Sequence, residues 1–367
     1  MNVLFAGGGT GGHLYPAIAI ADALRDRANV LFVGSADRIE TTIVPKAGYA
    51  LATVASRPLT RRLSFELART ALANARGTLQ ALRVVARAKP DIVIATGGYV
   101  CFPVVFAARI LRALGLVHAP IALLEPNAQP GLTNRLLAPM VDEVWGAFSD
   151  GDARFAGKYV HAGIPVRAAL RALPTREDAK VRLGLAPTRR TLLAMGGSQG
   201  ARSINDALTT LLRGAGLPEG WQLIHVTGER EYDRVRRELG REEGAVRPYL
   251  DDMSDAYAAA DLVLARAGAS TLGELAATGR PAILVPYPHA ADDHQRANAE
   301  RVARAGAALV LDDRDLAAGK LGLTLAEATA PSRLAALEAA AQRLREADPV
   351  ATILARIDAL AARRSAA

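Results

Sequence analysis

The stretch "GGGTGGH", from Gly7 to His13, contains residue types that could bind an anion and accept a proton. It follows the apolar run 3–6, so its pattern predicts a strand, a tight loop and then a helix. Glycine lets backbone N–H groups approach a ligand closely, and the first turn of a helix has N–H groups without internal partners. Histidine exchanges protons near neutral pH, which makes His13 a candidate base. A tight turn that holds no ligand is the alternative for this loop.

The spacing of Gly7, Gly9 and Gly12 also fits the dinucleotide-binding pattern. That pattern expects an acidic residue at the end of the second strand, about 20 residues further on. Here the apolar run ends at Val33, and three small residues separate it from Asp37. The sequence therefore disfavours an NAD-dependent oxidoreductase.

Two later segments have the same order of strand, small residues and helix: "GGSQGAR" at 196–202 and "RAGASTLGEL" at 266–275. The hydroxyls of Ser270 and Thr271 would lie in the first helical turn, where hydroxyl and amide groups can bind phosphate. Glu274, one turn later, could accept hydrogen bonds from the paired hydroxyls of a ribose. An acidic residue stabilised by the helix dipole is the equal alternative for Glu274.

The segment "DDHQRANA" at 292–299 gathers polar residues at another expected strand-to-helix junction. The amides of Gln295 and Asn298 offer both donors and acceptors, which suits sugar hydroxyls. Metal binding is the rival, but the spacing of His289 and His294 in a loop that follows a proline fixes no ligand geometry. We expect no metal site.

The apolar pattern predicts the elements that would hold these segments. Aliphatic and β-branched runs alternate with alanine-rich helical stretches, which is typical of parallel βαβ units. The expected strands are Asn2–Ala6, Val30–Val33, Leu51–Ala55, Ile92–Ala95, Ile121–Leu124, Val144–Ala147, Thr191–Met195, Gln222–Val226, Ala245–Leu250, Leu262–Ala265, Ala282–Pro286 and Ala308–Leu311. The expected fold class is α/β, with one doubly wound parallel sheet in each half and a domain boundary near Gly163, where glycine and two prolines interrupt the pattern.

Composition narrows the class of protein. At 367 residues and 50% apolar composition, the chain can bury the cores of two domains. Its formal net charge of +8 favours anionic partners. Cys101 is the only cysteine and the amino terminus has no secretory pattern, which together favour the cytoplasm. The longest apolar region, 104–124, contains two arginines and a histidine and does not predict a membrane-spanning helix.

The positive charge is concentrated at 57–89, which holds eight basic residues and one acidic residue. Four arginines recur every seven residues: Arg62, Arg69, Arg76 and Arg83. An apolar residue lies three places after each of the first three arginines: Phe65, Leu72 and Leu79. A helix would set a basic stripe beside an apolar one, which suits an anionic membrane surface. A helix packed on the core with a solvated arginine face is an equal alternative. The segment lacks interleaved aromatic residues, so no nucleic acid partner is expected.

Taken together, these motifs resemble those of the MurG family, the UDP-N-acetylglucosamine transferases of peptidoglycan synthesis. The resemblance covers nearly the whole chain. It rests on segments that occur in the family's order: "GGTGGH", "ADRIETTIVPK", "KPDIVIATGGYV", "PGLTNRLLA", "GGSQGAR", "YLDDMSDAYAAADLV", "RAGASTLGELAATGRPAILVPYP" and "DDHQRANA". Two positions depart from the family's common motifs, because Leu124 stands where histidine is common and Ile164 where asparagine is common.

The resemblance implies a GT-B fold, in which two Rossmann-like domains face each other across a cleft. It implies that residues 1–163 bind the lipid-linked acceptor and the membrane and that residues 164–345 bind the donor UDP-N-acetylglucosamine (UDP-GlcNAc). The helix within 346–367 is expected to pack back on the first domain. The implied reaction transfers N-acetylglucosamine, with inversion, to the 4-hydroxyl of N-acetylmuramic acid in lipid I and forms lipid II. The implied location is peripheral, at the cytoplasmic face of the plasma membrane, with no cofactor.

Roles on the acceptor side follow from the chemistry of the implied reaction. The acceptor hydroxyl has a pKa far above 7, so a base that removes its proton assists attack. His13 is the expected base, with Glu125 in reserve. A histidine that only caps the start of the helix is the alternative for His13. Thr10, Gly11 and Gly12 are expected to line the acceptor site.

Roles on the donor side are implied in the same way. The uracil is expected at Leu250 and Arg167, and the sugar at Asn127 and Gln295. The diphosphate and ribose are expected at Ser198, Ala269, Ser270, Thr271, Leu272, Gly273 and Glu274. A GT-B enzyme that glycosylates a diacylglycerol or a small natural product is the main alternative.

Overall fold

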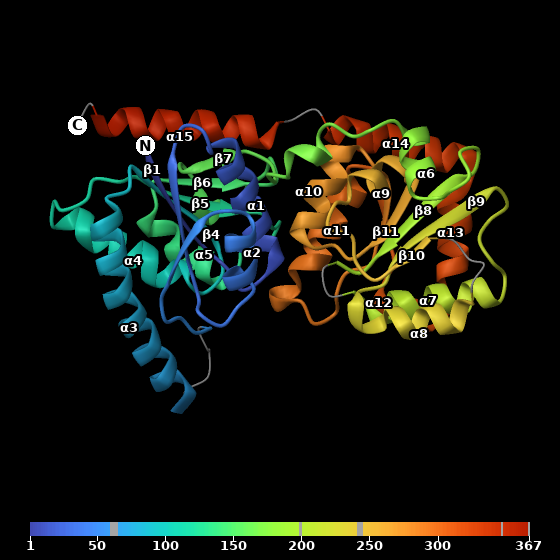
Figure 1. The fold of residues 1–367 in the computed structure, drawn as a ribbon, viewed down its shortest axis with the longest axis horizontal. Coiled ribbons are helices and arrows are strands. Elements are labelled where there is room, and N and C mark those ends of the chain that lie inside the picture. Colours follow the sequence, from blue (N-terminus) through green and yellow to red (C-terminus); the bar gives the residue numbers. More distant parts are fainter. Residues whose placement is uncertain (59–64, 198–199, 241–244, 346–347, 366–367) are drawn as a thin grey trace. The chain divides into compact units, whose positions relative to one another are not determined.

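The computed structural model describes residues 1–58, 65–197, 200–240, 245–345 and 348–365. The chain forms two compact units: unit 1 comprises Met1–Arg167 with Asp348–Ala367, and unit 2 comprises Ala168–Ala347. Each unit contains one sheet with helices on both of its faces (Figure 1). Unit 1 therefore continues to Arg167, slightly beyond the expected boundary at 163.

Unit 1 has a seven-stranded parallel sheet in the order β3-β2-β1-β4-β5-β6-β7. Its strands are β1 (Asn2–Gly7), β2 (Asn29–Gly34), β3 (Ala50–Thr53), β4 (Ile92–Gly97), β5 (Ile121–Glu125), β6 (Glu143–Gly146) and β7 (Tyr159–His161). Its helices are α1 (Gly11–Ala23), α2 (Glu40–Lys46), α3 (Phe65–Ala88), α4 (Cys101–Ala113), α5 (Leu132–Leu137) and α15 (Pro349–Ser365), with 3₁₀ turns at Ala138–Met140 and Ala153–Phe155. The strand order reverses between β1 and β4, the place where open α/β sheets bind ligands.

The β1 strand shows how this sheet is buried on both faces. Leu4 and Ala6 belong to the core that includes residues of α3 and α4, whereas Val3 and Phe5 belong to the core that includes residues of α1 and α15. This alternation follows from the two-residue period of a strand.

The carboxy-terminal helix α15 packs on unit 1 through Ile353 and Ile357, which are fully buried. Arg356 of this helix pairs with Glu143 of β6, and Arg356 Nε lies 3.0 Å from Glu143 Oε2. Burial alone would raise the pKa of Glu143, but the hydrogen bonds from Arg356 and Trp145 outweigh it and lower the pKa. An ion pair thus reinforces the apolar contact.

Unit 2 has a six-stranded parallel sheet in the order β10-β9-β8-β11-β12-β13. Its strands are β8 (Arg190–Met195), β9 (Trp221–Val226), β10 (Ala245–Arg247), β11 (Leu262–Ala265), β12 (Ala282–Leu284) and β13 (Ala308–Val310). Its helices are α6 (Arg176–Arg182), α7 (Arg202–Arg213), α8 (Glu229–Leu239), α9 (Ser254–Ala259), α10 (Ala269–Thr278), α11 (His294–Arg304), α12 (Asp313–Ala317), α13 (Leu321–Thr329) and α14 (Pro331–Leu344), with 3₁₀ turns at Ala168–Leu170 and Ala291–Asp293.

The predicted fold class is confirmed, and each of the twelve expected strands is present. The sequence missed β7, a three-residue edge strand whose residues are half-buried or exposed. Such a strand lacks the apolar run that marks a buried one.

The basic segment forms one continuous helix, α3, and Gly77 does not interrupt it. A Cβ at Gly77 would lie 1.8 Å from the carbonyl oxygen of Ala55, so glycine allows α3 to approach the chain after β3. In Figure 1 the amino-terminal part of α3 extends beyond the sheet of unit 1. Arg61 and Arg62 lie outside the described residues.

Candidate active site

The first glycine loop joins β1 to α1 at the carboxyl edge of the unit 1 sheet. Gly9 has φ +83°, a conformation that favours glycine. Thr10 is exposed and its side chain does not cap the helix. Because Gly11 and Gly12 are the first two residues of α1, their N–H groups have no acceptor within the helix. The loop therefore offers a hydroxyl and helix-start donors to an anion.

His13 is held at this edge by the carboxyl end of β4. Its Nδ1 lies 3.0 Å from the carbonyl oxygen of Thr96. A carbonyl can only accept, so Nδ1 donates and Nε2 carries the lone pair that can take a proton. A Cβ at Gly97, which has φ +107°, would lie 2.3 Å from Nδ1.

The glycine pair Gly97 and Gly98, at the end of β4, is thus part of the candidate site, although the sequence analysis gave it no role. A Cβ at Gly98 would lie 2.4 Å from the carbonyl oxygen of Gly8 in the first loop. Two glycines directly after a buried strand were the signal that could have identified this close approach.

Glu125, the last residue of β5, is 2% exposed. Its carboxylate accepts hydrogen bonds from Asn127 N and Nδ2 at 3.0 and 3.2 Å, from Asn134 Nδ2 at 2.8 Å and from Gly131 N at 3.3 Å. Burial raises the pKa of Glu125 to about 7, although these hydrogen bonds favour the ionised form. The carboxylate therefore organises the loop that presents Asn127, which is half-buried. Asn134 was missed by the sequence reasoning.

Arg167 belongs to unit 1, the unit that contains the first glycine loop. Its guanidinium lies 5.8 Å from the ring centroid of Tyr15 on α1. The two departures from the family's common motifs, Leu124 and Ile164, are both buried. Each apolar side chain therefore occupies a place in the core where a polar one would need a partner.

In unit 2, the start of α10 has the features of an anion site. Gly268 is the N-cap residue, and Leu272 N donates to its carbonyl oxygen at 3.0 Å. The preceding N–H groups, those of Ala269, Ser270 and Thr271, have no acceptor within the helix. Ser270 Oγ is buried, and no described residue is its hydrogen-bond partner. A bound phosphate would supply the missing acceptor.

Glu274 lies one turn further along α10, beside Leu272 and Gly273, which are buried. Its Oε2 accepts a hydrogen bond of 2.7 Å from the hydroxyl of Tyr257, a fully buried side chain. The partly exposed Glu274 carboxylate is thereby fixed from behind. Leu250, the expected uracil contact, is half-buried after β10.

The loop before α11 places Gln295 and Asn298 differently. Gln295 is half-buried, and its Oε1 accepts a hydrogen bond of 3.0 Å from Tyr287 N. Asn298 is fully buried and its Nδ2 donates to the carbonyl oxygen of Ala267 at 3.2 Å. The idea that Asn298 reads a sugar hydroxyl is therefore wrong; its amide supports the chain that leads into α10.

The second glycine loop, between β8 and α7, includes Ser198, which lies outside the described residues. Gly200 has φ +74°, and a Cβ there would lie 2.2 Å from the carbonyl oxygen of Thr227. Behind the loop, Asn205 Nδ2 donates to the same carbonyl at 3.0 Å. Asn205 Oδ1 must then accept from His225 Nε2 at 2.9 Å.

Arg266 connects several loops at this edge and was missed by the sequence analysis. Its side chain is 11% exposed and pairs with Asp313 at 2.5 Å. It also donates to Ser203 Oγ at 2.8 Å and lies 5.5 Å from the ring centroid of Tyr287. A lone arginine directly after a buried strand was the available signal.

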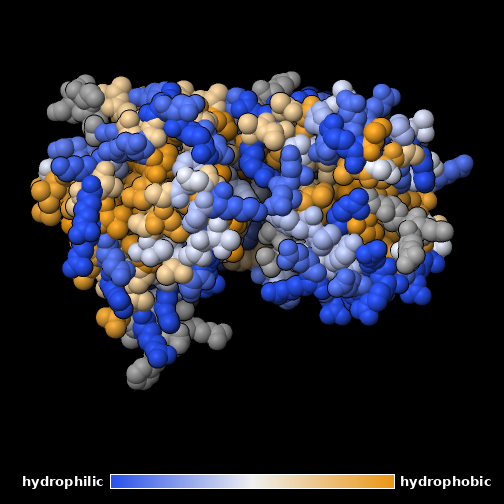
Figure 2. Space-filling view, viewed as in Figure 1, coloured by the Kyte–Doolittle hydropathy of each residue, from blue (hydrophilic) through white to orange (hydrophobic). Residues whose placement is uncertain are grey.

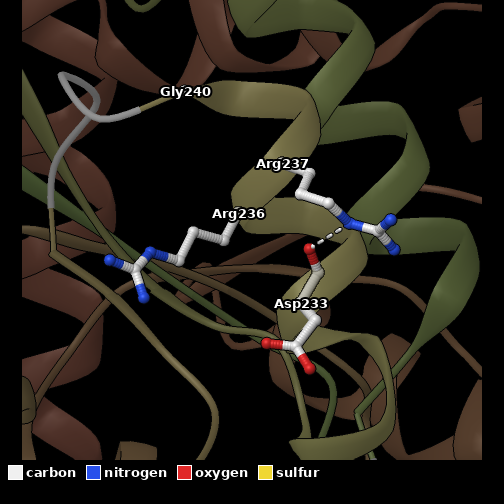
Figure 3. Close-up of a pocket in the computed structure, with 4 residues that line it drawn as sticks. All are labelled: Asp233, Arg236, Arg237 and Gly240. Atoms are coloured by element: carbon white, nitrogen blue, oxygen red, sulfur yellow. Dashed lines mark hydrogen bonds between the residues drawn. The ribbon is translucent and has the colours of Figure 1, made fainter.

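A pocket elsewhere on unit 2 is lined by Asp233, Arg236, Arg237 and Gly240 at the end of α8. Arg237 Nε donates to the backbone carbonyl of Asp233 at 3.1 Å, and the two arginines point in different directions (Figure 3). Since no set of polar groups converges there, we assign it no ligand. Within the described residues, no group of three or more acidic, histidine or cysteine side chains is arranged to hold a metal ion.

Comparison with known proteins identifies the family. The glycosyltransferase family 28 N-terminal domain matches residues 3–145, and the family 28 C-terminal domain matches residues 191–353. The chain is 42% identical over 336 residues to the UDP-N-acetylglucosamine--N-acetylmuramyl-(pentapeptide) pyrophosphoryl-undecaprenol N-acetylglucosamine transferase of Halothermothrix orenii, covering 88% of each chain. The chain belongs to the MurG family. The predicted family is confirmed, and with it the assignment as a hexosyltransferase.

Solved structures agree with this assignment. The crystal structure of Acinetobacter baumannii MurG matches 98% of this chain and 99% of its own with a TM-score of 0.73 and 27% identity. The calicheamicin glycosyltransferase CalG4 matches 99% of this chain and 98% of its own with a TM-score of 0.67, but at 17% identity it shows the fold alone. The GT-B fold class with two Rossmann-like units is confirmed.

Proposed function

We propose that this chain transfers N-acetylglucosamine from UDP-GlcNAc to the 4-hydroxyl of N-acetylmuramic acid in lipid I, an undecaprenyl-pyrophosphoryl acceptor, and so forms lipid II. The MurG family membership supports the reaction class. The observation that carries the mechanism is the hydrogen bond between His13 and Thr96, which orients an imidazole beside helix-start amides.

On the acceptor side, His13 Nε2 removes the proton from the attacking hydroxyl. Thr10, Gly11 and Gly12 contact the acceptor, whose pyrophosphate suits the helix-start N–H groups. Glu125 serves chiefly to hold Asn127 and the loop around it, because its four hydrogen bonds occupy both oxygens. It remains the reserve base.

On the donor side, the diphosphate binds at the start of α10 with Ser198, and Glu274 accepts hydrogen bonds from the ribose. Leu250 and Arg167 contact the uracil, and Asn127 and Gln295 contact the sugar. As the bond to UDP breaks, negative charge develops on the diphosphate, and preorganised N–H groups stabilise that charge without a divalent ion. A single displacement inverts the anomeric centre.

Contact with an anionic membrane is part of the proposal, at the cytoplasmic face of the plasma membrane. Arg69, Arg76 and Arg83 are exposed on α3, beside Leu72 and Leu79, which are 73% and 63% exposed. Hydrophilic and hydrophobic side chains lie next to one another on the projecting part of unit 1 (Figure 2). Within the described chain, no helix combines the length and apolar character that crossing a bilayer requires.

The transfer reaction is tested with labelled UDP-GlcNAc and a lipid I analogue, with and without a chelator. We expect a β-linked disaccharide in both arms. A diacylglycerol and a small natural-product alcohol serve as competing acceptors. Transfer to either of these in preference to lipid I would overturn the proposed substrate.

Membrane contact is tested by replacing Arg69, Arg76 and Arg83 with glutamate. At about 1 kcal/mol for each basic residue near an anionic surface, binding to phosphatidylglycerol vesicles should weaken by about 100-fold or more. The control has the same charge change on unit 2, where Arg230, Arg236 and Arg237 of α8 are exposed. An equal loss of vesicle binding in both variants would show that binding depends on the net charge of the protein and not on α3.

A further inference from the structure

Glu40, the first residue of α2, is a fully buried carboxylate that faces the first glycine loop. Its Oε2 accepts a hydrogen bond of 3.0 Å from Gly9 N, and its Oε1 accepts one of 2.8 Å from Ser35 N. One side chain thus connects the loop after β1 to the loop after β2. The hydroxyl of Ser35 extends this connection to Ser56, at 2.8 Å.

The surrounding glycines fit this carboxylate closely. A Cβ at Gly8 would lie 2.3 Å from Glu40 Oε1, and a Cβ at Gly34 would lie 2.5 Å from Glu40 Cγ. These contacts are shorter than side chains tolerate, so both positions accommodate Glu40 by lacking a side chain. The glycine at position 8 therefore serves a group of the protein rather than a ligand.

This arrangement changes what the loop can bind. In the dinucleotide-binding pattern, glycine-loop amides face a ligand pyrophosphate. Here the Gly9 N–H is already bonded to a carboxylate, which would also repel a phosphate placed at the same point. The donors left for a ligand include the Thr10 hydroxyl and the N–H groups of Gly11 and Gly12 at the start of α1, next to His13.

We propose that Glu40 is a positioning residue for the acceptor: it acts as a built-in anion that fixes the first glycine loop, so that the start of α1 and His13 meet the acceptor in one geometry. This inference rests on the proposed function, because it assigns the first loop to the lipid-linked pyrophosphate. Glu40 itself is buried behind the loop and does not contact substrate.

The test is Glu40→Gln, which keeps the size of the side chain but turns an NH₂ group toward either Gly9 N or Ser35 N. We expect the KM for a lipid I analogue to rise at least 10-fold, since one N–H group loses its acceptor. The KM for UDP-GlcNAc and the Kd of UDP should stay within twofold. Asp37→Asn is the matched control, because it removes the same charge three residues before Glu40, at a side chain that is 78% exposed.

Gly8→Ala provides a second variant in which no charge changes. Its Cβ displaces the Glu40 carboxylate, so the same selective rise in acceptor KM is expected. An unchanged acceptor KM in both variants, or an equal rise in donor and acceptor KM, would overturn the inference. Failure of the proposed function has a different signature: the unaltered protein would bind UDP without transferring sugar to lipid I, or would not bind UDP.

Discussion

The two glycine-rich loops each follow a strand and lead into a helix, but different residues pack behind them. In unit 1 the loop after β1 rests on the Glu40 carboxylate. In unit 2, Gly200 in the loop after β8 packs closely against the carbonyl oxygen of Thr227. The side-chain amide of Asn205 donates a hydrogen bond to that oxygen. Behind Asn205 stands His225, whose pKa burial lowers to about 4, so this imidazole is neutral at pH 7.

The difference concerns charge as well as shape. A carboxylate behind a loop disfavours a second anion there, whereas the amide of Asn205 and the neutral imidazole of His225 carry no charge that would oppose one. Two loops with similar sequences therefore differ in the charge of the residues packed behind them. The glycine pattern alone does not distinguish them.

The largest expected effect is that of His13→Ala. Loss of a general base should lower kcat by about 10²- to 10⁴-fold, while the Kd of UDP stays unchanged, because His13 is not among the proposed UDP contacts. Rapid-quench transfer assays and calorimetry measure the two quantities. His161→Ala, at an exposed histidine of the same unit, is the control. If His13→Ala kept the full rate and Glu125→Ala abolished it, the base would be Glu125.

His225 should make unit 2 sensitive to acid. Its folded-state pKa of about 4 lies below the ordinary value of 6.5, so the unfolded chain binds the extra proton more readily. The contribution to stability is complete above pH 6.5 and is lost as the pH falls toward 4, by up to about 3 kcal/mol. The cause is burial, and Nδ1, where the proton would bind, has no described partner.

Urea unfolding at pH 7 and pH 4.5 measures this loss. The chain has two tryptophans, one in each unit, so Trp145→Phe leaves Trp221 of β9 as the reporter of unit 2. In that background His225→Gln should reduce the difference between the two pH values. His118→Gln, at an exposed histidine of unit 1, should leave it as it was. An unchanged pH dependence in His225→Gln would show that other groups cause the acid sensitivity.

The strands of both sheets could be predicted from the sequence, but the side chains that support the candidate-site loops could not. Most of the twelve strands were predictable because buried parallel strands are continuous apolar runs, as in β4 and β11. The half-exposed β3 was predictable because its sequence, ALAT, is still largely apolar. The missed strand, β7, is short and partly exposed, so its hydrogen bonds to β6 define it rather than its composition.

The candidate site was predictable where a residue lies beside its own motif, as His13 and Glu274 do. The supporting residues were not predictable in this way. Thr96 is 83 residues from His13, Tyr257 is 17 from Glu274, and Glu40 is 31 from Gly9. Spacing within a motif carries no information on such partners, since the fold alone brings them together.

Glu274→Gln tests the donor half of the comparison. A hydrogen bond to a charged group contributes about 1.5 to 3 kcal/mol, so the Kd of UDP should rise by about 10- to 100-fold. The acceptor KM should not change, in contrast to the Glu40 variant. Glu300→Gln on α11, at an exposed position, is the control. An unchanged Kd of UDP would favour the alternative, that Glu274 is a carboxylate stabilised by the helix dipole and has no ligand.

The smallest expected effect is that of Tyr257→Phe, which removes only the hydroxyl that orients Glu274. A neutral donor to a carboxylate in a buried setting contributes about 1 kcal/mol, so the Kd of UDP should rise about fivefold. A double-mutant cycle isolates this contribution, because Tyr257→Phe should cost much less when Glu274→Gln is already present. Additive losses would mean that Tyr257 acts on the core of unit 2 and not through Glu274. Coupling of about 1 kcal/mol would show that Tyr257 orients Glu274 in unit 2, the counterpart of the Thr96 carbonyl that holds His13 in unit 1.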